Sequence, residues 1–191
     1  MKDLTEEEIR SEQLLDGHLL RVFRDTVRLP DGTESIREWI DHPGASAVVP
    51  LFEDRTTLLI RQFRYPSRRT FLEVPAGKID IEGEDPQDVA ARELEEETGW
   101  RARSFVPLGA LYPCIGYSNE IIHFYLAEGL ENGERELEEG EHLELVPMRF
   151  EEALSLIETA EIVDMKSVAA LLYARSYVER RDARLAAEKE R

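Results

Sequence analysis

Residues 77–100 read GKIDIEGEDPQDVAARELEEETGW, the most informative stretch of the chain. Asp85 followed by Pro86 is typical of a helix start, because aspartate caps free amide groups and proline suits the first helical position. Gly99 is a typical stop signal, so the pattern predicts a helix from about Pro86 to Thr98. That helix carries four carboxylates within five residues. Such a run is tolerable on a solvated face and useful where a divalent cation binds.

Helical spacing separates these carboxylates into two groups. At about 100° per residue, Glu93, Glu96 and Glu97 fall on one face. Glu95 points to the opposite side, and Arg92 precedes Glu96 by one turn and can pair with it. Three carboxylates on one face offer hard oxygen ligands, which suit Mg²⁺ or, as an alternative, Mn²⁺. A solvated acidic face is the ordinary interpretation of such a run, so the flanking sequence must decide.

The flanking sequence resembles the Nudix box, which has a glycine, a glutamate and then Arg-Glu-hydrophobic-x-Glu-Glu-x-Gly-hydrophobic. The nine specified positions are filled by Gly77, Glu84, Arg92, Glu93, Leu94, Glu96, Glu97, Gly99 and Trp100. One residue more than is usual for the family lies between the first two, ahead of the helix, so the spacing of the helical carboxylates is unchanged. Nine matched positions are far more specific than a lone glycine motif.

Further segments are similar to the ADP-ribose pyrophosphatase branch of the Nudix hydrolases: residues 38–45 (EWIDHPGA), 61–66 (RQFRYP) and 72–78 (LEVPAGK). Residues 112–120 (YPCIGYSNE) stand in place of a Ser-Pro-Gly…Asp-Glu loop, with Cys114-Ile115 where Ser-Pro is usual. The resemblance implies Mg²⁺-dependent hydrolysis of ADP-ribose to AMP and ribose 5-phosphate. The Cys-Ile departure leaves open another nucleoside diphosphate sugar, such as ADP-glucose or GDP-mannose. A ligand-sensing Nudix domain without catalysis is a third interpretation.

The resemblance also assigns roles around the metal. It implies four ligands on the helix and the turn before it: Ala76 through its backbone carbonyl, Glu93, Glu96 and Glu97. In the resembled branch a glutamate on a later acidic loop deprotonates the attacking water. Residues 131–142 (ENGERELEEGEH) form such a loop, in which Glu139 best matches the base and Glu141 a further metal ligand. The predicted catalytic residues are Glu139, Glu97 and Glu96. An ordinary solvated loop is the competing interpretation.

Substrate contacts are expected outside the box. Arg64 is predicted to bind a phosphate, because a guanidinium offers two parallel donors to phosphate oxygens. By resemblance, Arg37 and Glu38 contact the adenine, and Leu20 or its neighbour Leu19 packs on the base. Glu120 is expected on the ribose side. Each of these residues also has a plain interpretation as an ordinary strand or loop residue.

Composition limits the class of protein. The chain has 191 residues, of which 42% are hydrophobic, enough for one globular domain with a small appendage. Its net charge of −17 argues against nonspecific binding to nucleic acid or to anionic membranes. The single cysteine excludes an internal disulfide and favours a cytoplasmic location. We find no run of about 18 apolar residues and no signal-peptide pattern, so no membrane association is expected.

The predicted fold class is α/β: a Nudix α/β/α sandwich with a mixed β-sheet, plus a small N-terminal antiparallel β-sheet. Strands are expected within residues 10–41 and at about 45–52, 57–63, 71–74, 106–111, 120–127 and 143–148. Helices are expected at about 86–98, 150–157 and 165–183. We predict two regions, residues 1–43 and residues 44–191. In the resembled enzymes the first exchanges between two subunits, which implies a homodimer, and the second is the hydrolase domain for a nucleotide-sugar substrate.

Overall fold

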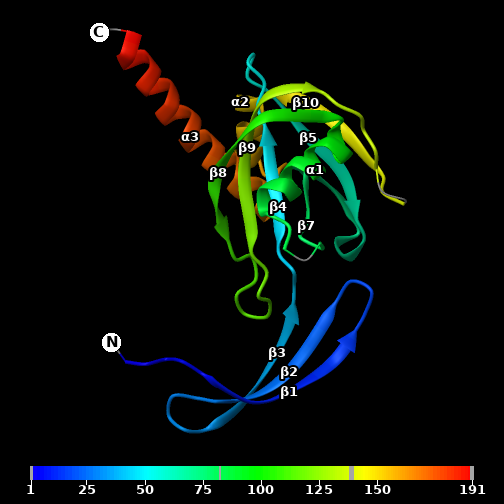
Figure 1. The fold of residues 1–191 in the computed structure, drawn as a ribbon, viewed down its shortest axis with the longest axis vertical. Coiled ribbons are helices and arrows are strands. Elements are labelled where there is room, and N and C mark those ends of the chain that lie inside the picture. The colour runs from blue at the N-terminus through cyan, green and yellow to red at the C-terminus, as the bar shows by residue number, and fades with distance from the viewer. Residues whose placement is uncertain (1, 82, 138–139, 190–191) are drawn as a thin grey trace. The chain divides into compact units, whose positions relative to one another are not determined.

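A computed structural model describes residues 2–81, 83–137 and 140–189. Contacts divide the chain into two compact units (Figure 1). The first contains Met1–Gly44 and Tyr112–Ile121, and the second contains Ala45–Leu111 and Ile122–Arg191. No helix in the described ranges has both the length and the apolar character needed to cross a bilayer.

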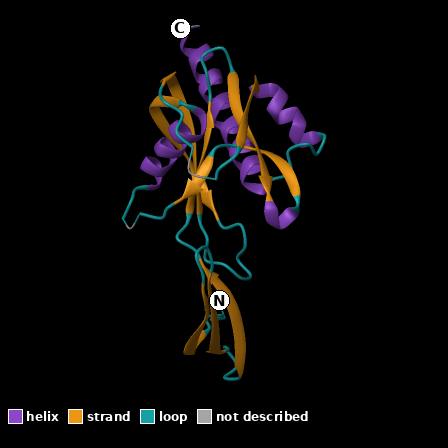
Figure 2. Ribbon diagram, turned by 90° about the vertical axis from the view of Figure 1, so that its right-hand side faces the viewer, coloured by secondary structure: helices purple, strands orange, loops and turns teal. Residues whose placement is uncertain are grey.

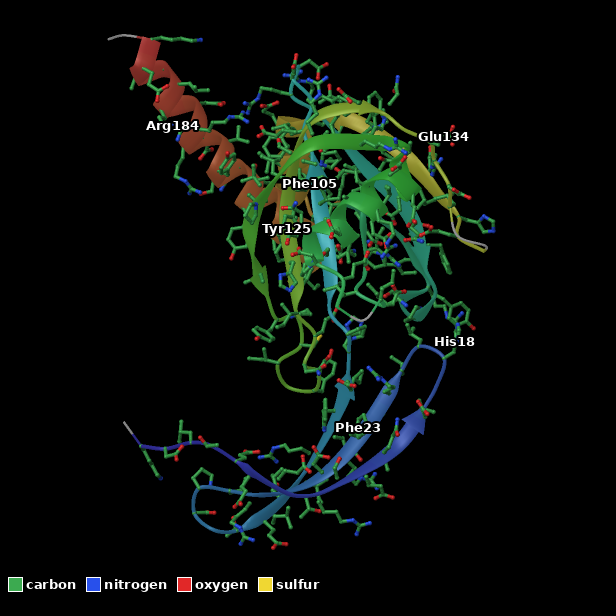
Figure 3. The ribbon with its side chains drawn as sticks, in the orientation of Figure 1. His18, Phe23, Phe105, Tyr125, Glu134 and Arg184 are labelled. Atoms are coloured by element: carbon green, nitrogen blue, oxygen red, sulfur yellow. The ribbon has the colours of Figure 1, made fainter. Side chains whose placement is uncertain are left out.

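The first unit is built on a three-stranded antiparallel sheet. Its strands pair in the order β1 (Glu7–Asp16), β2 (Arg21–Arg28) and β3 (Glu34–Asp41). The connections form where turn residues stand: the Gly17 amide donates to the Leu20 carbonyl, and the Gly32 amide to the Leu29 carbonyl, both at 2.9 Å. Phe23, labelled in Figure 3, stacks on Trp39 across the sheet with ring centroids 5.2 Å apart. The predicted N-terminal antiparallel sheet is confirmed.

The second unit contains two sheets and the helices. A mixed sheet has the order β7 (Ala76–Lys78), β4 (Ala45–Pro50), β9 (Ile122–Asn132) and β8 (Trp100–Leu111), with β4 and β9 parallel. An antiparallel sheet has the order β10 (Leu143–Arg149), β5 (Thr56–Arg64) and β6 (Arg69–Glu73). The helices are η1 (Tyr65–Ser67, a 3₁₀ turn), α1 (Pro86–Thr98), α2 (Phe150–Glu158) and α3 (Met165–Lys189).

Strand β4 is buried on both faces, which places it in the middle of the layers. Ala47 and Val49 belong to a core cluster shared with α2 and α3, whereas Val48 belongs to a cluster shared with α1. Successive strand residues point to opposite faces, so α1 covers one face of the mixed sheet and α2 and α3 cover the other. Figure 2 shows helices on both sides of the strands of this unit. The predicted α/β/α sandwich with a mixed sheet is confirmed.

Helix α1 forms where the sequence predicts it, for local reasons. The Asp85 side chain accepts a hydrogen bond from the Gln87 amide at 2.8 Å. Gly99 ends the helix with a φ of 75°, a left-handed conformation that favours glycine. Leu94 is fully buried, in the cluster that contains Tyr125 (Figure 3). The helix is therefore fixed at both ends and on one side, which sets the direction of its remaining face.

Several elements differ from the prediction. Strand β9 extends to Asn132 rather than to about residue 127, helix α3 extends to Lys189 rather than to about residue 183, and two strands differ more. β8 begins at Trp100 rather than at about residue 106, because the polar residues before Phe105 pair with the far end of β9, where Trp100 lies opposite Asn132. Ala76 and Gly77, predicted in a turn, belong to the short strand β7 against β4. Partners remote in the sequence supply both pairings, so local residue patterns do not reveal them.

Candidate active site

One face of α1 lies against strand β7 and the residues that lead into it. Glu97 is 2% exposed and accepts a hydrogen bond from the Ala76 amide at 3.1 Å. Gly77 lies so close to Glu93 that a Cβ at this position would be 1.8 Å from Oε1 of the carboxylate. Position 77 therefore accepts only glycine if the Glu93 carboxylate is to stay in place. Strand β7 thus fixes the two inner carboxylates of the α1 face.

Arg92 organises the outer part of the same face. Its Nη1 donates to Glu93 Oε1 at 2.8 Å and to Glu96 Oε2 at 3.1 Å. The predicted pairing of Arg92 with Glu96 is confirmed. Glu95 is bound by Arg101 at 2.6 Å and takes no part in these contacts, as the helical spacing predicts. The four clustered carboxylates are therefore divided into a set of three and a bystander.

Burial and mutual repulsion oppose ionisation of this face. Burial raises the pKa of Glu93 to about 7; Arg92 opposes the shift, and the charges of Glu96 and Glu141 add to it. Burial also raises the pKa of Glu97 well above its ordinary value, and the charges of Glu93 and Glu141 add to that shift. The charge of Glu141, on the loop after β9, therefore acts on both inner carboxylates.

This donor set fits a divalent cation. Carboxylate and carbonyl oxygens are the ligands that Mg²⁺ and Mn²⁺ prefer, and a bound cation favours the charged form of groups that repel one another without it. Among the described residues, no three carboxylate, imidazole or thiol groups are already arranged as a finished ligand cluster. A cation bound by these carboxylates would therefore require their side chains to adjust.

Arg64, the predicted phosphate contact, ends β5 and is held by Glu73. Its Nε and Nη2 donate to the two oxygens of Glu73, each at 2.8 Å. Glu73 is almost fully buried and also accepts a hydrogen bond from Lys166, which pairs with Asp164 at 2.9 Å. The hydrogen bond with Glu73 raises the pKa of Arg64, and the charges of Glu73, Glu97 and Asp164 contribute. The guanidinium therefore lies within electrostatic reach of the carboxylate face.

The acidic loop after β9 is anchored on the end of α1. The Gly133 amide donates to the Gly99 carbonyl at 2.8 Å, and Arg135 Nε donates to the Glu97 carbonyl at 2.7 Å. Arg135 Nη2 also reaches the Leu143 carbonyl at 3.1 Å. Glu134, labelled in Figure 3, begins the acidic run of this loop. The predicted base, Glu139, lies outside the described residues.

Comparison with known proteins gives two family matches. Residues 41–171 match the NUDIX domain, and residues 6–40 match the nucleoside diphosphate sugar hydrolase N-terminal domain. The chain belongs to the Nudix family. An ADP-ribose pyrophosphatase from Bacillus subtilis (strain 168) is 41% identical over 175 residues, which cover 91% of this chain and 94% of that protein. A methanol dehydrogenase activator from Bacillus methanolicus is 38% identical over 170 residues, covering 88% and 91%.

A solved structure of an ADP compounds hydrolase superposes on this Nudix chain with a TM-score of 0.83. The superposition covers 95% of this chain and 98% of the other at 23% sequence identity, so it establishes the shared fold. Together with the family matches, it confirms the predicted Nudix fold. The family matches and the relatives confirm the predicted assignment to the Nudix pyrophosphatases.

The remaining candidates belong to the first unit, outside the Nudix box. Arg37 Nε donates to Glu6 at 2.9 Å, and Glu38 pairs with Arg24 at 2.6 Å. Adjacent strand residues point to opposite faces, so Arg37 and Glu38 serve different faces of the sheet. The other two candidates are Leu20, which is exposed, and Glu120, whose carboxylate is 3.9 Å from Nδ1 of His42. Their roles in substrate binding stay predictions.

Sequence reasoning missed three residues that support the site: Glu73, Lys166 and Arg135. Glu73 carried a signal, since a lone carboxylate within the apolar run Phe71–Val74 must find a cation when the strand is buried. Lys166 carried none, because nothing in its neighbourhood indicates a partner 93 residues earlier in the chain. Arg135 is flanked by glutamates in the sequence. That pattern fits an exposed salt bridge as well as it fits the observed hydrogen bonds to backbone carbonyls.

Proposed function

We propose that this Nudix protein hydrolyses the pyrophosphate bond of ADP-ribose to AMP and ribose 5-phosphate, with Mg²⁺ or, as an alternative, Mn²⁺. The observation that carries the proposal is the packing beside β7 of Glu97, which is buried, and of Glu93, whose side chain is 14% exposed, where the charge of Glu141 acts on both. Binding of a divalent cation to these carboxylates offsets both burial and repulsion. The similarity to a bacterial ADP-ribose pyrophosphatase supports the choice of substrate.

The reaction must overcome the negative charge on both phosphoryl groups of the substrate. A bound cation would neutralise that charge and lower the pKa of a water bound to it. The residues proposed to hold it are Glu93, Glu96, Glu97, Glu141 and, through its carbonyl, Ala76. Glu139 is proposed to accept a proton from the attacking water, whose oxygen joins one phosphorus while the bridging oxygen leaves with the other phosphate. Arg64 is proposed to bind a phosphoryl oxygen and orient the linkage.

The first test is Mg²⁺-dependent release of AMP from ADP-ribose, measured for the wild type, Glu97→Gln and Glu95→Gln. Glutamine at position 97 keeps the size of the side chain but removes a charged oxygen ligand, so activity should be lost. Glu95 is bound to Arg101 on the opposite side of α1, so Glu95→Gln should stay close to the wild type. Wild-type turnover by Glu97→Gln contradicts the metal assignment, and no AMP release by the wild type contradicts the function.

A second candidate function is the same chemistry on another nucleoside diphosphate sugar, such as ADP-glucose or GDP-mannose. The match of residues 6–40 to the nucleoside diphosphate sugar hydrolase N-terminal domain favours it, because that match names a class of substrates rather than one sugar. The Cys114-Ile115 departure from the branch also supports it. A panel of these compounds with product identification separates the two candidates by their kcat/KM values.

We further propose that residues 1–43 form a dimerisation region and residues 44–191 the hydrolase domain. Strand β1 is exposed along its whole length, with Ile9, Leu14 and Leu15 among its exposed side chains. A second copy of the sheet would bury such apolar groups. Light scattering should then give twice the 22.0 kDa mass of the chain, whereas a monomer contradicts this proposal. Leu20, Arg37, Glu38 and Glu120 are proposed to complete the nucleoside site.

The proposed setting is the cytoplasm, with a free nucleotide sugar as the substrate and with neither nucleic acid nor membrane as a partner. The single cysteine and the net charge of −17 support this setting. Cell fractionation tests the location. A substrate panel that includes short RNA and DNA tests the exclusion of nucleic acid, which cleavage of either would contradict.

A further inference from the structure

We propose that Glu73 is a positioning residue that aims Arg64 at a phosphoryl group of the substrate, with Lys166 as the counter-charge that makes this arrangement stable. The inference rests on the proposed pyrophosphatase function and deepens it. It concerns three residues far apart in the sequence whose side chains meet at the ends of β5 and β6 and the start of α3.

Glu73 holds the guanidinium of Arg64 by one edge. Nε and Nη2 each donate to a different oxygen of the carboxylate at 2.8 Å, which fixes both the position and the plane of the group. A guanidinium has five N–H donors in a rigid plane, and this pairing uses two of them. The remaining donors point away from Glu73. Because the Arg64 side chain is 41% exposed, that free edge can meet a phosphoryl group.

Glu73 is buried where a lone carboxylate would be costly. Its side chain is 2% exposed, and two cations face it, Arg64 and Lys166. Burial raises the pKa of Glu73, but the hydrogen bond from Arg64 and the charge of Lys166 outweigh it and leave the pKa below its ordinary value. Lys166 shares the Glu73 carboxylate with Arg64 and pairs in turn with Asp164. The carboxylate is therefore held from two sides, and the pairing with Glu73 leaves the outer N–H groups of Arg64 free for an anionic substrate.

The orientation of Glu73 is fixed by its neighbours along the chain. The Val74 amide donates to the Ser167 hydroxyl at 2.9 Å, and that hydroxyl donates to Asp164 at 2.6 Å. Asp164 also pairs with Lys166, so the start of α3 holds both the strand and the counter-charge. Farther along the same segment, the Ala76 amide holds the Glu97 carboxylate. A single run of chain therefore sets the distance between the proposed phosphate contact and the metal ligands.

The first experiment measures binding without turnover. Methylenediphosphonate, a non-hydrolysable pyrophosphate analogue, is titrated with Mg²⁺ into the wild type, Glu73→Gln, Arg64→Ala and the double variant. We expect Glu73→Gln to weaken binding by about 10-fold or more, since a misplacement near 1 Å costs a factor of this order. In the Arg64→Ala background the same change should cost less than about 3-fold, because the residue through which Glu73 acts is absent.

Steady-state kinetics on ADP-ribose are measured for the same four proteins. We expect Glu73→Gln to lower kcat/KM by about 10- to 100-fold. The matched control is Glu144→Gln. This change removes the exposed carboxylate that lies 2.8 Å from Arg61, which is on the same strand, β5, as Arg64. Residues 61 and 64 point to opposite faces of β5, so this control should stay within about 2-fold of the wild type. Should Glu73→Gln fail to fold, Lys166→Met provides the second variant, with a smaller loss that also disappears without Arg64.

A third measurement separates positioning from general stability. The Nε–H signal of Arg64 in ¹H–¹⁵N spectra, assigned by its loss in Arg64→Ala, should exchange slowly with water in the wild type. It should exchange fast in Glu73→Gln and stay slow in Glu144→Gln. Unchanged exchange in Glu73→Gln, or an equal loss of analogue binding with and without Arg64, overturns the proposal. If the wild type binds the analogue but releases no AMP from ADP-ribose, the proposed function fails while the binding cycle still decides the role of Glu73.

Discussion

Replacing Gly77 by alanine tests whether β7 fixes the Glu93 carboxylate for metal binding. The added Cβ would lie 1.8 Å from Oε1 and 2.0 Å from Cδ of Glu93. Favourable carbon contacts begin at about 3.5 Å, so the carboxylate must retreat by about 1.5 Å. Mg²⁺ accepts oxygen ligands only at about 2.0–2.1 Å and in nearly ideal octahedral geometry. A displacement of that size removes Glu93 from the coordination shell.

The fold should survive this substitution. Gly77 lacks the positive φ that strains other residues, so its backbone accepts alanine, and such a replacement gains about 0.4–1 kcal/mol by restricting the unfolded chain. Moving the Glu93 side chain off its preferred rotamer costs about 0.5–1.5 kcal/mol. The two effects nearly cancel, but the retreat also breaks the hydrogen bond from Arg92 to Glu93, and bonds between charged groups contribute about 1.5–3 kcal/mol. The free energy of unfolding should therefore fall by no more than about 3 kcal/mol. Metal affinity should fall by about 10- to 100-fold or more, since changes in groups that merely support a ligand already cost that much.

Two assays on Gly77→Ala, Glu93→Ala and their combination decide the matter. Mn²⁺ affinity is measured by calorimetry, and the free energy of unfolding by urea titration without metal. If the methyl group acts through Glu93, adding Gly77→Ala to Glu93→Ala should leave the Mn²⁺ affinity unchanged and should add only the gain of about 0.4–1 kcal/mol from the restricted unfolded chain. Wild-type Mn²⁺ affinity in Gly77→Ala refutes the close approach. A further loss of stability above about 1 kcal/mol in the double variant shows that the methyl group strikes the backbone instead.

Two further predictions follow from the same carboxylate face and from its anchored loop. Burial raises the folded-state pKa of Glu93 to about 7 from 4.5, so the stability of the metal-free protein should carry the full contribution of Glu93 below pH 4.5. It should then lose up to about 3 kcal/mol as the pH rises through 7, and Mg²⁺ should remove most of this loss in urea titrations; a stability that rises over this interval contradicts the reasoning. Arg135→Ala removes the hydrogen bonds to the Glu97 and Leu143 carbonyls and should lower kcat about 10-fold or more by freeing the loop with Glu139 and Glu141. Arg101→Ala, which frees only Glu95, is the control, and equal effects of the two variants contradict the role of the anchor.

The parts of this structure that local chemistry controls could be predicted from the sequence. Asp85, Pro86 and Gly99 act within one turn of their own positions, so both ends of α1 agree with the prediction. The division of Glu95 from its neighbours also follows from helical geometry alone. The effect of the Glu141 charge on the α1 face was expected from the family resemblance rather than from geometry, because a loop with several glutamates does not indicate which of them acts on the site.

What could not be predicted depends on pairings between distant segments. The first residues of β8 are in a strand because they pair with the end of β9. The second cation that contacts Glu73 is Lys166, from α3. Neither partner is visible near the residue that needs it. A buried carboxylate in an apolar strand predicts that some cation exists, since an unpaired charge there would cost several kcal/mol. It does not predict which residue supplies the cation. Arg64 is held in place only if it is one of the cations that pair with Glu73.

The segment from Glu73 to Gly77 shows why the site needs this arrangement. Glu73 holds Arg64, the Ala76 amide holds Glu97, and the bare Cα of Gly77 leaves room for Glu93. These contacts come from neighbouring residues of one strand-to-strand connection, so their spacing is fixed by covalent geometry rather than by loop packing. The proposed pyrophosphate substrate would contact the cation and the Arg64 guanidinium at a set separation. A shift of the whole segment would move both groups together, which preserves the separation on which orientation of the linkage depends.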